Sequence, residues 1–231
     1  MYTFFSENKK ENRFVIEGEE FKHLTVRRIR KGEKIGIIFR DSLYECELVS
    51  FAQNKAFAQI LKKLEIPIPP VNITLLQSVP LDLKLMDSII QKAVEVGINQ
   101  VIPIITERSL RDTERVIKRI DRWKRIAKEA MKQCNRPLSM EINHPVHIID
   151  IKENSAQKLL LHPDKRSIPI GSINPQREVY LAVGPEGGFS HEDIKVLKLK
   201  GFTLVKILPY TMRTETAGIV ASAIIMNSAC P

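Results

Sequence analysis

A proline-dense run, Ile66-Pro67-Ile68-Pro69-Pro70, constrains the fold of this chain more than any other stretch. Proline fixes φ and has no amide hydrogen, so such a run continues neither a helix nor a central strand and stiffens a connection. We therefore place a domain boundary there, with one domain over residues 1–68 and a second over residues 71–231. The hydrophobic patterns on the two sides of the run differ, which supports this boundary.

Before the prolines, short segments alternate apolar and polar residues in the manner of β-strands. They span residues 34–40, 43–50 and 55–62, and a helical stretch over 18–30 precedes them. Because no crossover helix fits between strands so close in sequence, we expect antiparallel pairing in a small β-barrel.

After the prolines, strand and helix patterns alternate. Strands are expected at 71–79, 100–105, 158–162, 178–183 and 203–208, and helices at 82–96, 113–134, 190–200 and 214–228. This alternation predicts an α/β domain with a mostly parallel sheet that is covered by helices on both faces.

Charge and cysteine content restrict the class of protein. Lys and Arg number 36 against 27 Asp and Glu, a formal net charge of +9, which favours an anionic partner: nucleic acid first, an acidic membrane surface second. Cys46, Cys134 and Cys230 are scattered and form no CxxC pair, which argues against a disulfide framework and a structural zinc site. We expect a cytoplasmic protein with no signal peptide, membrane segment or metal.

The segment Gly184-Pro185-Glu186-Gly187-Gly188 is the strongest candidate for a ligand site. It follows an expected strand and precedes a helix that Ser190 and Asp193 can cap as a capping box. Glycines let the backbone approach a ligand closely at the carboxyl end of a parallel strand, although a plain strand-to-helix connection would also use one or two of them. The segment matches neither the dinucleotide-binding nor the P-loop pattern.

A second strand-to-helix junction runs from Leu208 to Ala217, with Thr214 as the expected N-cap. The helix that follows is rich in small apolar residues, which suits burial in the core or in a dimer interface. Arg213 at this junction is a candidate to contact a phosphate or a developing negative charge, or to pair with Glu186 or Glu215.

Basic residues gather in two other places. His23, Arg27 and Arg30 share one face of the first helix, with Arg28 beside them, and we interpret this face as an RNA contact rather than a solvated surface. The basic residues of the 113–134 helix, including Lys132, are interpreted as a solvated face. The Asn135-Arg136 pair at the end of that helix is expected to be exposed and able to reach a ligand.

Several of these segments belong to a wider set of motifs. The set comprises His23–Arg28 with Lys31-Gly32-Glu33, Lys84, Gln91–Gly97, Ile102-Pro103, Glu107-Arg108-Ser109, Arg122-Trp123, Glu129-Ala130, Gln133, Asn135-Arg136, Gly184–Ser190 and Met212–Ala217. With these motifs the chain resembles the SPOUT methyltransferases, and within them the bacterial enzymes that methylate N3 of a uridine in 16S ribosomal RNA of the small subunit.

The resemblance implies a trefoil-knotted SPOUT methyltransferase domain, a PUA-like RNA-binding barrel before it, and a homodimer. It also implies that S-adenosylmethionine binds in the knot. The residues that it assigns to this cofactor are Leu161, His162, Gly184, Pro185, Glu186, Gly187, Gly188, Leu208, Tyr210 and Met212. The chain departs from the family at Pro209, where the family usually has glycine, so any cofactor contact from that amide is lost.

The resemblance also suggests roles in the reaction. Arg213 would steady the uracil oxygens as negative charge builds, and Glu186 is a candidate base whose more natural role is to structure the loop. His23, Arg27, Arg28, Arg30, Asn135 and Arg136 would contact RNA. Two alternatives remain at this point: methylation of another RNA, such as a transfer RNA ribose or base, and a non-catalytic assembly factor that binds RNA. The intact glycines at 184, 187 and 188 disfavour the second.

Overall fold

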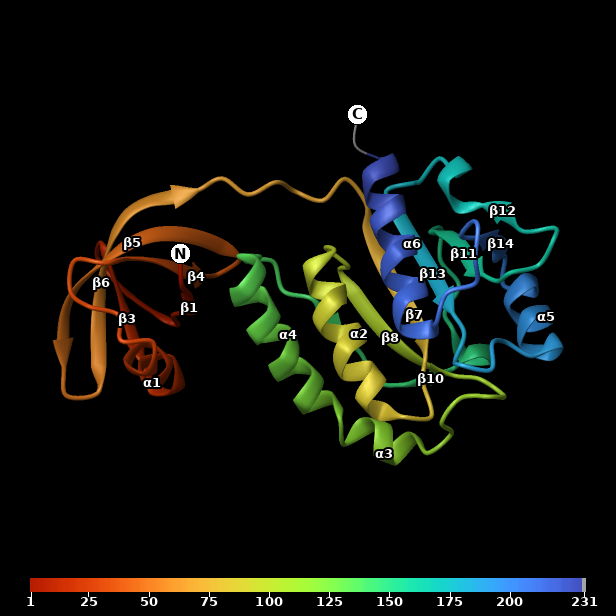
Figure 1. Ribbon diagram of the computed structural model, residues 1–231, viewed down its shortest axis with the longest axis horizontal. Coiled ribbons are helices and arrows are strands. Elements are labelled where there is room, and N and C mark those ends of the chain that lie inside the picture. The colour runs from red at the N-terminus through yellow and green to blue at the C-terminus, as the bar shows by residue number, and fades with distance from the viewer. Residues whose placement is uncertain (230–231) are drawn as a thin grey trace. The chain divides into compact units, whose positions relative to one another are not determined.

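The computed structural model describes residues 1–229 of the chain (Figure 1). The chain divides into two compact units: residues 1–68 with 128–139, and residues 69–127 with the described residues from 140 on. The sequence analysis had assigned residues 128–139 to the second domain. They are the end of helix α4 (Ile120–Cys134) and the five residues after it, so one helix contributes to both units.

The N-terminal unit is built on a six-stranded sheet. In spatial order its strands are β1 (Thr3–Phe5), β4 (Lys34–Phe39), β5 (Ser42–Ala52), β6 (Lys55–Leu64), β3 (Arg13–Glu17) and β2 (Asn8–Lys10), and the helix is α1 (Gly18–Val26). The three predicted strands are confirmed as β4, β5 and β6. Phe14, Ile16, Leu24, Ile35 and Leu48 are buried in the core between α1 and the sheet.

Two expectations for this unit are wrong in detail. The first helix ends at Val26 rather than Arg30, because Arg28 adopts a left-handed backbone with φ 57° that a helix cannot continue through. β1 pairs with β4 in parallel, so the pairing is not purely antiparallel. Between these two strands the chain forms β2, β3 and α1, which is enough sequence for a parallel crossover.

The second unit contains the predicted parallel sheet, and every pairing recorded in it is parallel. The spatial order is β10 (Val146–His147), β8 (Gln100–Ile105), β7 (Asn72–Ser78), β13 (Glu178–Val183), β11 (Gln157–Leu161), β14 (Thr203–Lys206) and β12 (Ile168–Pro169), with β9 (Glu141–Ile142) beside β8. The two-residue strands β9, β10 and β12 were not predicted, because so short a segment carries no readable alternation.

Helices cover both faces of this sheet, as predicted. They are α2 (Leu83–Glu95), α3 (Thr113–Ile117), α4, α5 (His191–Leu199) and α6 (Thr214–Ser228), with 3₁₀ turns η1 (Ile148–Asp150) and η2 (Ile170–Ser172). In Figure 1, α2 and α6 lie side by side. Gly218 of α6 packs on Leu75, whereas Leu197 of α5 clusters with Leu76. Because successive strand residues face opposite sides, α5 and α6 lie on opposite faces.

The helix predicted over 113–134 is broken into α3 and α4 by a turn at Lys118 and Arg119. The break follows two β-branched residues, Val116 and Ile117, which lower helix propensity. The predicted apolar stripe survives the break, since Val116, Ile120 and Trp123 are all buried.

Among the cysteines that the structure describes, Cys46 is a free thiol. Cys46 lies in the core of the N-terminal unit, where burial raises the pKa of its thiol to about 12, and Cys134 is exposed. Cys230 lies outside the described residues. None of the helices within residues 1–229 is long and apolar enough to cross a membrane.

The close packing of α6 on the sheet leads to a stability prediction. A Cβ atom at Gly218 would lie 3.2 Å from Leu75 Cδ1 and 3.3 Å from Val183 Cγ2. Gly218→Val should therefore lower the free energy of unfolding by about 1–3 kcal/mol through overpacking, as measured by denaturant titration. Gly171→Val is the control, because a Cβ at Gly171 meets no atom within 4 Å. Equal stability of the two variants would contradict the packing argument.

Candidate functional site

A pocket of about 340 Å³ lies at the carboxyl ends of β11, β13 and β14. β11 pairs in parallel with β13 on one side and with β14 on the other, so the loops after the three strands leave the same edge of the sheet. The lining residues are Arg108, Leu161, His162, Pro163, Val183, Gly184, Glu186, Gly187, Gly188, Phe189, Lys206, Ile207, Tyr210, Thr211, Met212, Thr214 and Ala217. This is the position at which ligands bind in open α/β sheets.

Most residues that the resemblance assigned to the cofactor line this one pocket. They are Leu161, His162, Gly184, Glu186, Gly187, Gly188, Tyr210 and Met212. Pro185 and Leu208 lie outside the lining: Pro185 is buried within its loop and Leu208 is exposed. Three segments that are distant in sequence therefore meet, as the resemblance implied.

The glycine-rich loop folds back tightly on itself. A Cβ at Gly184 would lie 3.1 Å from the Phe189 amide nitrogen, and Gly188 has φ 66°. Both positions therefore require glycine for the backbone path itself. After the loop, α5 begins with the predicted capping box, in which the Ser190 hydroxyl accepts from the Asp193 amide and the Asp193 carboxylate accepts from the Ser190 amide.

Thr214 does not cap α6, contrary to the prediction. It is the first residue of the helix, and its hydroxyl instead donates to the Gly184 carbonyl at 2.6 Å. The same hydroxyl accepts a 2.9 Å hydrogen bond from the side-chain amide of Gln77, which also donates to the Ser78 carbonyl. This link ties the start of α6 and the glycine-rich loop to the end of β7.

Gln77 supports the site through Thr214, a role that the sequence analysis missed, and it is fully buried. The signal was present, because a glutamine directly follows Leu75 and Leu76 inside the strand predicted over 71–79. A buried amide must find hydrogen-bond partners, so such a residue indicates a polar connection to a neighbouring segment.

Arg108 lines the pocket. It belongs to the Glu107-Arg108-Ser109 motif, for which the sequence predicted no role. It follows β8, and its Nη1 donates to the Gly187 carbonyl at 2.8 Å. This hydrogen bond fixes the position of the glycine-rich loop. The guanidinium also adds a positive charge to the lining of the pocket.

The two predicted catalytic residues lie at the pocket in different ways. Glu186 is in the lining, and its carboxylate accepts from the Leu81 amide at 3.4 Å. Arg213 is exposed and outside the lining, although its neighbours Met212 and Thr214 belong to it. Within residues 1–229, Arg213 forms no ion pair with Glu186 or Glu215, so the alternative role as an ion-pair partner is not supported.

His162 contributes an uncharged side chain to the lining of the pocket. Burial lowers the pKa of its imidazole, an effect that nearby Asp164 only partly opposes. Asp164 itself is held ionised by Arg166, which hydrogen-bonds its carboxylate and keeps the pKa of that group far below its usual range. At neutral pH the pocket therefore presents a neutral imidazole at this position.

The predicted RNA-contacting residues lie in the N-terminal unit. His23 and Arg27 line a second pocket, of about 570 Å³, while Arg28 and Arg30 are exposed just after α1. Asn135 is exposed and accepts a hydrogen bond from the Thr3 hydroxyl. Arg136 is half-buried and its Nε donates to the Leu138 carbonyl at 2.8 Å, so the expectation of an exposed Asn-Arg pair is wrong for the arginine.

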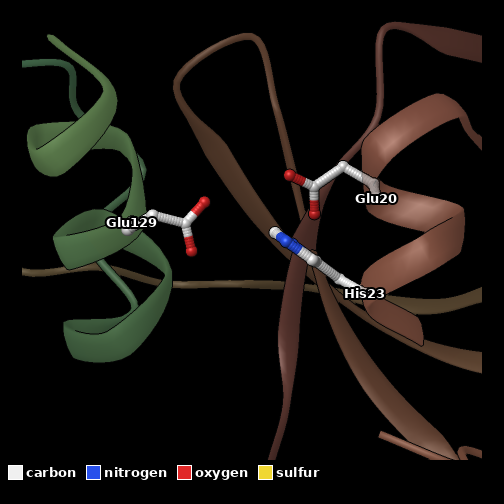
Figure 2. Close-up of side chains that lie close together, drawn as sticks. All are labelled: Glu20, His23 and Glu129. Atoms are coloured by element: carbon white, nitrogen blue, oxygen red, sulfur yellow. The ribbon is translucent and has the colours of Figure 1, made fainter. Parts of the chain in front are cut away.

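Lys132 is not the solvated residue that the sequence suggested. Its side chain is only 9% exposed, and its ammonium lies 2.7 Å from Glu129 and 3.1 Å from Glu20. Glu20, His23 and Glu129 are the one cluster among residues 1–229 with the geometry of a metal site, and Figure 2 shows them pointing toward one another from α1 and α4. Because the lysine ammonium contacts all three side chains, it supplies the positive charge that a metal ion would otherwise supply.

The chain is similar to two protein families and to individual proteins of known name. Residues 67–226 match the family described as RNA methyltransferase domain, and residues 16–61 match the family described as RNA methyltransferase PUA domain. Ribosomal RNA small subunit methyltransferase E of Aquifex aeolicus is 40% identical over 228 residues, 98% of this chain and 100% of the relative. The protein of the same name from Mesomycoplasma hyopneumoniae is 31% identical over 227 residues, 95% of this chain and 96% of the relative.

Among solved structures, a ribosomal RNA small subunit methyltransferase E from Neisseria gonorrhoeae, bound to S-adenosyl methionine, superimposes with a TM-score of 0.87. It is 27% identical, and the match covers 98% of this chain and 97% of that one. These likenesses confirm the predicted α/β methyltransferase fold and the PUA domain before it; the trefoil knot stays a prediction.

The hydrogen bond between Thr214 and the loop can be tested by an isosteric change. Thr214→Val removes the hydroxyl and leaves the Gly184 carbonyl and the buried Gln77 amide without this partner. Unsatisfied buried groups cost about 1–3 kcal/mol each, so the free energy of unfolding should fall by at least that amount in denaturant titration. The matched control is Thr216→Val on the exposed side of the same helix. If both variants unfold alike, the hydroxyl does not hold the loop.

Proposed function

We propose a function for this chain from one premise: it belongs to the RNA methyltransferase family that includes the proteins named ribosomal RNA small subunit methyltransferase E. The protein transfers a methyl group from S-adenosylmethionine to N3 of a uridine in 16S ribosomal RNA of the small subunit. The observation that carries the proposal is the pocket at the ends of β11, β13 and β14, in a chain that aligns over 98% of its length with a relative solved bound to S-adenosyl methionine.

The residues of the pocket fit this cofactor. Leu161, Phe189 and Met212 give it an apolar lining, and its volume of about 340 Å³ lies within the usual range for small-molecule sites. Gly184 and Gly188 let the loop backbone turn beside the pocket, because a Cβ at Gly184 would crowd the loop and Gly188 has a positive φ. His162, whose pKa is lowered by burial, adds no positive charge of its own beside a sulfonium ion.

When bound, S-adenosylmethionine supplies an activated methyl group. The protein's own task is to position the acceptor and to exclude water. N3 of uridine lies on the Watson–Crick edge and carries a proton, so the base must be unpaired, and N3 must lose that proton. Arg213, beside the pocket residues Met212 and Thr214, steadies the uracil oxygens as their charge grows.

Glu186 is better suited to shaping the loop than to accepting the proton. Its carboxylate is exposed and already accepts a hydrogen bond from the Leu81 amide. We therefore assign Glu186 a structural role, and Arg108 supports the same loop through Gly187.

The proposal includes a homodimer in the bacterial cytoplasm, where small-subunit RNA is found. Leu208 and Tyr210 beside the pocket are large apolar residues that are 58% and 79% exposed. Exposed apolar residues of this size mark interaction surfaces when they occur together.

Pro209, between Leu208 and Tyr210, has no amide hydrogen to donate to the cofactor, but the Leu208 carbonyl remains as an acceptor.

The function is tested by mass spectrometry of nucleosides from ribosomal RNA in cells with and without this gene. We expect 3-methyluridine to disappear from small-subunit RNA when the gene is deleted and to return with the wild-type gene. Gly187→Arg should fail to restore it, because its side chain would enter the pocket beside Arg108. Gly171→Arg, which meets open space, should restore it. An unchanged nucleoside profile after deletion would overturn the uridine-N3 assignment.

The role of Arg213 makes a separate prediction. Arg213→Ala should lower turnover by about 100-fold, the usual effect of removing one group that stabilises developing charge, while leaving the dissociation constant for S-adenosylmethionine unchanged. Single-turnover methylation and calorimetric titration measure the two quantities. Arg115→Ala, an exposed arginine of α3, is the control. Wild-type turnover in Arg213→Ala would remove this residue from the mechanism.

A further inference from the structure

The second pocket, in the N-terminal unit, has no part in the chemistry described above. The first residues of the chain, α1 and the end of α4 enclose it, and its volume is about 570 Å³. It contains two residues, His23 and Arg27, that the sequence analysis assigned to RNA without saying what part of the RNA they contact. The residues that line the pocket indicate which part of the RNA they contact.

One wall is a fixed polar network. The Lys132 ammonium contacts Glu129 Oε1 at 2.7 Å, Glu20 Oε1 at 3.1 Å and His23 Nδ1 at 3.2 Å. An ammonium group only donates hydrogen bonds, so His23 Nδ1 accepts from Lys132, and Nε2 is the ring nitrogen that carries a proton. Lys132 therefore fixes the orientation of the His23 ring, and Nε2, on the side of the ring opposite Lys132, is a hydrogen-bond donor.

A second wall offers flat and apolar surface. Tyr2 is 51% exposed, and the Arg27 guanidinium lies 5.2 Å from the centroid of its ring. Val26 of the same pocket is 78% exposed. Aromatic rings and guanidinium planes are the surfaces on which unpaired nucleic-acid bases stack.

The charges of the pocket favour a base over a phosphate. Lys132, which would attract a phosphate, is already neutralised by two carboxylates, and the Glu129 carboxylate would repel one. The other cation of the lining, Arg27, lies over the Tyr2 ring. A base, by contrast, needs a stacking surface together with hydrogen-bonding groups at its edge. Tyr2 and Arg27 provide the first, and His23 and the exposed Gln133 provide the second.

We propose that this pocket holds one unstacked base of the substrate RNA, with Tyr2 as the stacking residue and His23 as a donor to the edge of the base. The proposal rests on the proposed function, because it takes ribosomal RNA as the substrate. It assigns the N-terminal unit a contact with a base in addition to the phosphate contacts that its exposed arginines can make.

The test measures methylation kinetics with small ribosomal subunits purified from cells that lack the gene. Tyr2→Ala should raise KM for the subunits by about 10-fold, the usual size of a lost base–aromatic stack, with kcat and the dissociation constant for S-adenosylmethionine unchanged. Tyr2→Phe keeps the ring and should behave as wild type. Phe51→Ala removes a comparably exposed aromatic ring of β5, outside the pocket, and should leave KM unchanged.

Salt dependence separates stacking from a phosphate contact. Because stacking releases no counterion, the slope of log KM against log salt concentration should be the same for Tyr2→Ala and wild type. A shallower slope for Tyr2→Ala would mean that a phosphate contact was lost and would overturn the proposal. A wild-type KM in Tyr2→Ala, or an equal rise in Phe51→Ala, would also overturn it, and in each of these cases the proposed function would stand.

Ultraviolet crosslinking gives a readout that does not depend on methylation. Irradiation of the wild-type protein with the same subunits, followed by mass spectrometry of peptides, should find a nucleotide attached to Tyr2, and Tyr2→Phe should retain a crosslink at that position. If the subunits are crosslinked at Tyr2 but are not methylated, the base pocket stands and the proposed function fails. If they are methylated and no crosslink forms at Tyr2, the base pocket fails.

Discussion

Parallel strands end at the same edge of a sheet, and β11 pairs in parallel with β13 on one side and with β14 on the other. Every feature of the candidate active site depends on that arrangement. The loops after these three strands converge although the ends of the first and the last strand, Leu161 and Lys206, lie 45 positions apart in the chain. The glycine-rich loop could not form a pocket by itself, since two of its glycines serve its own tight turn.

Polar groups buried beside the pocket keep these loops in place. Gln77 donates to the Thr214 hydroxyl, which donates in turn to the Gly184 carbonyl, so strand β7, helix α6 and the loop after β13 are joined. Arg108 holds the same loop through Gly187 from the solvent side. Such fixed hydrogen bonds preorganise a site, because the loop need not be ordered again when a ligand binds.

The N-terminal unit uses the partly buried charge of Lys132 in a comparable way. Lys132 lies between two carboxylates and a histidine, where an unpaired ammonium would be costly and a paired one orients its neighbours. The lysine belongs to helix α4, whose end groups with this unit although its beginning packs in the other. The proposed base pocket thus depends on residues more than 100 positions apart in the chain.

The sequence by itself determined the periodic parts of this protein. The proline run, the strand and helix patterns, the capping box at Ser190 and the glycine-rich loop could be read locally, because each depends on residues within a few positions of one another. Only the tertiary structure decided that Thr214 bonds the loop rather than capping α6 and that Lys132 is largely withdrawn from solvent. It also decided that Gln77 supports the loop through Thr214 and that Tyr2 lines a pocket. Those roles depend on partners brought close by folding, and the spacing of residues along a chain does not reveal which distant polar group a side chain will meet.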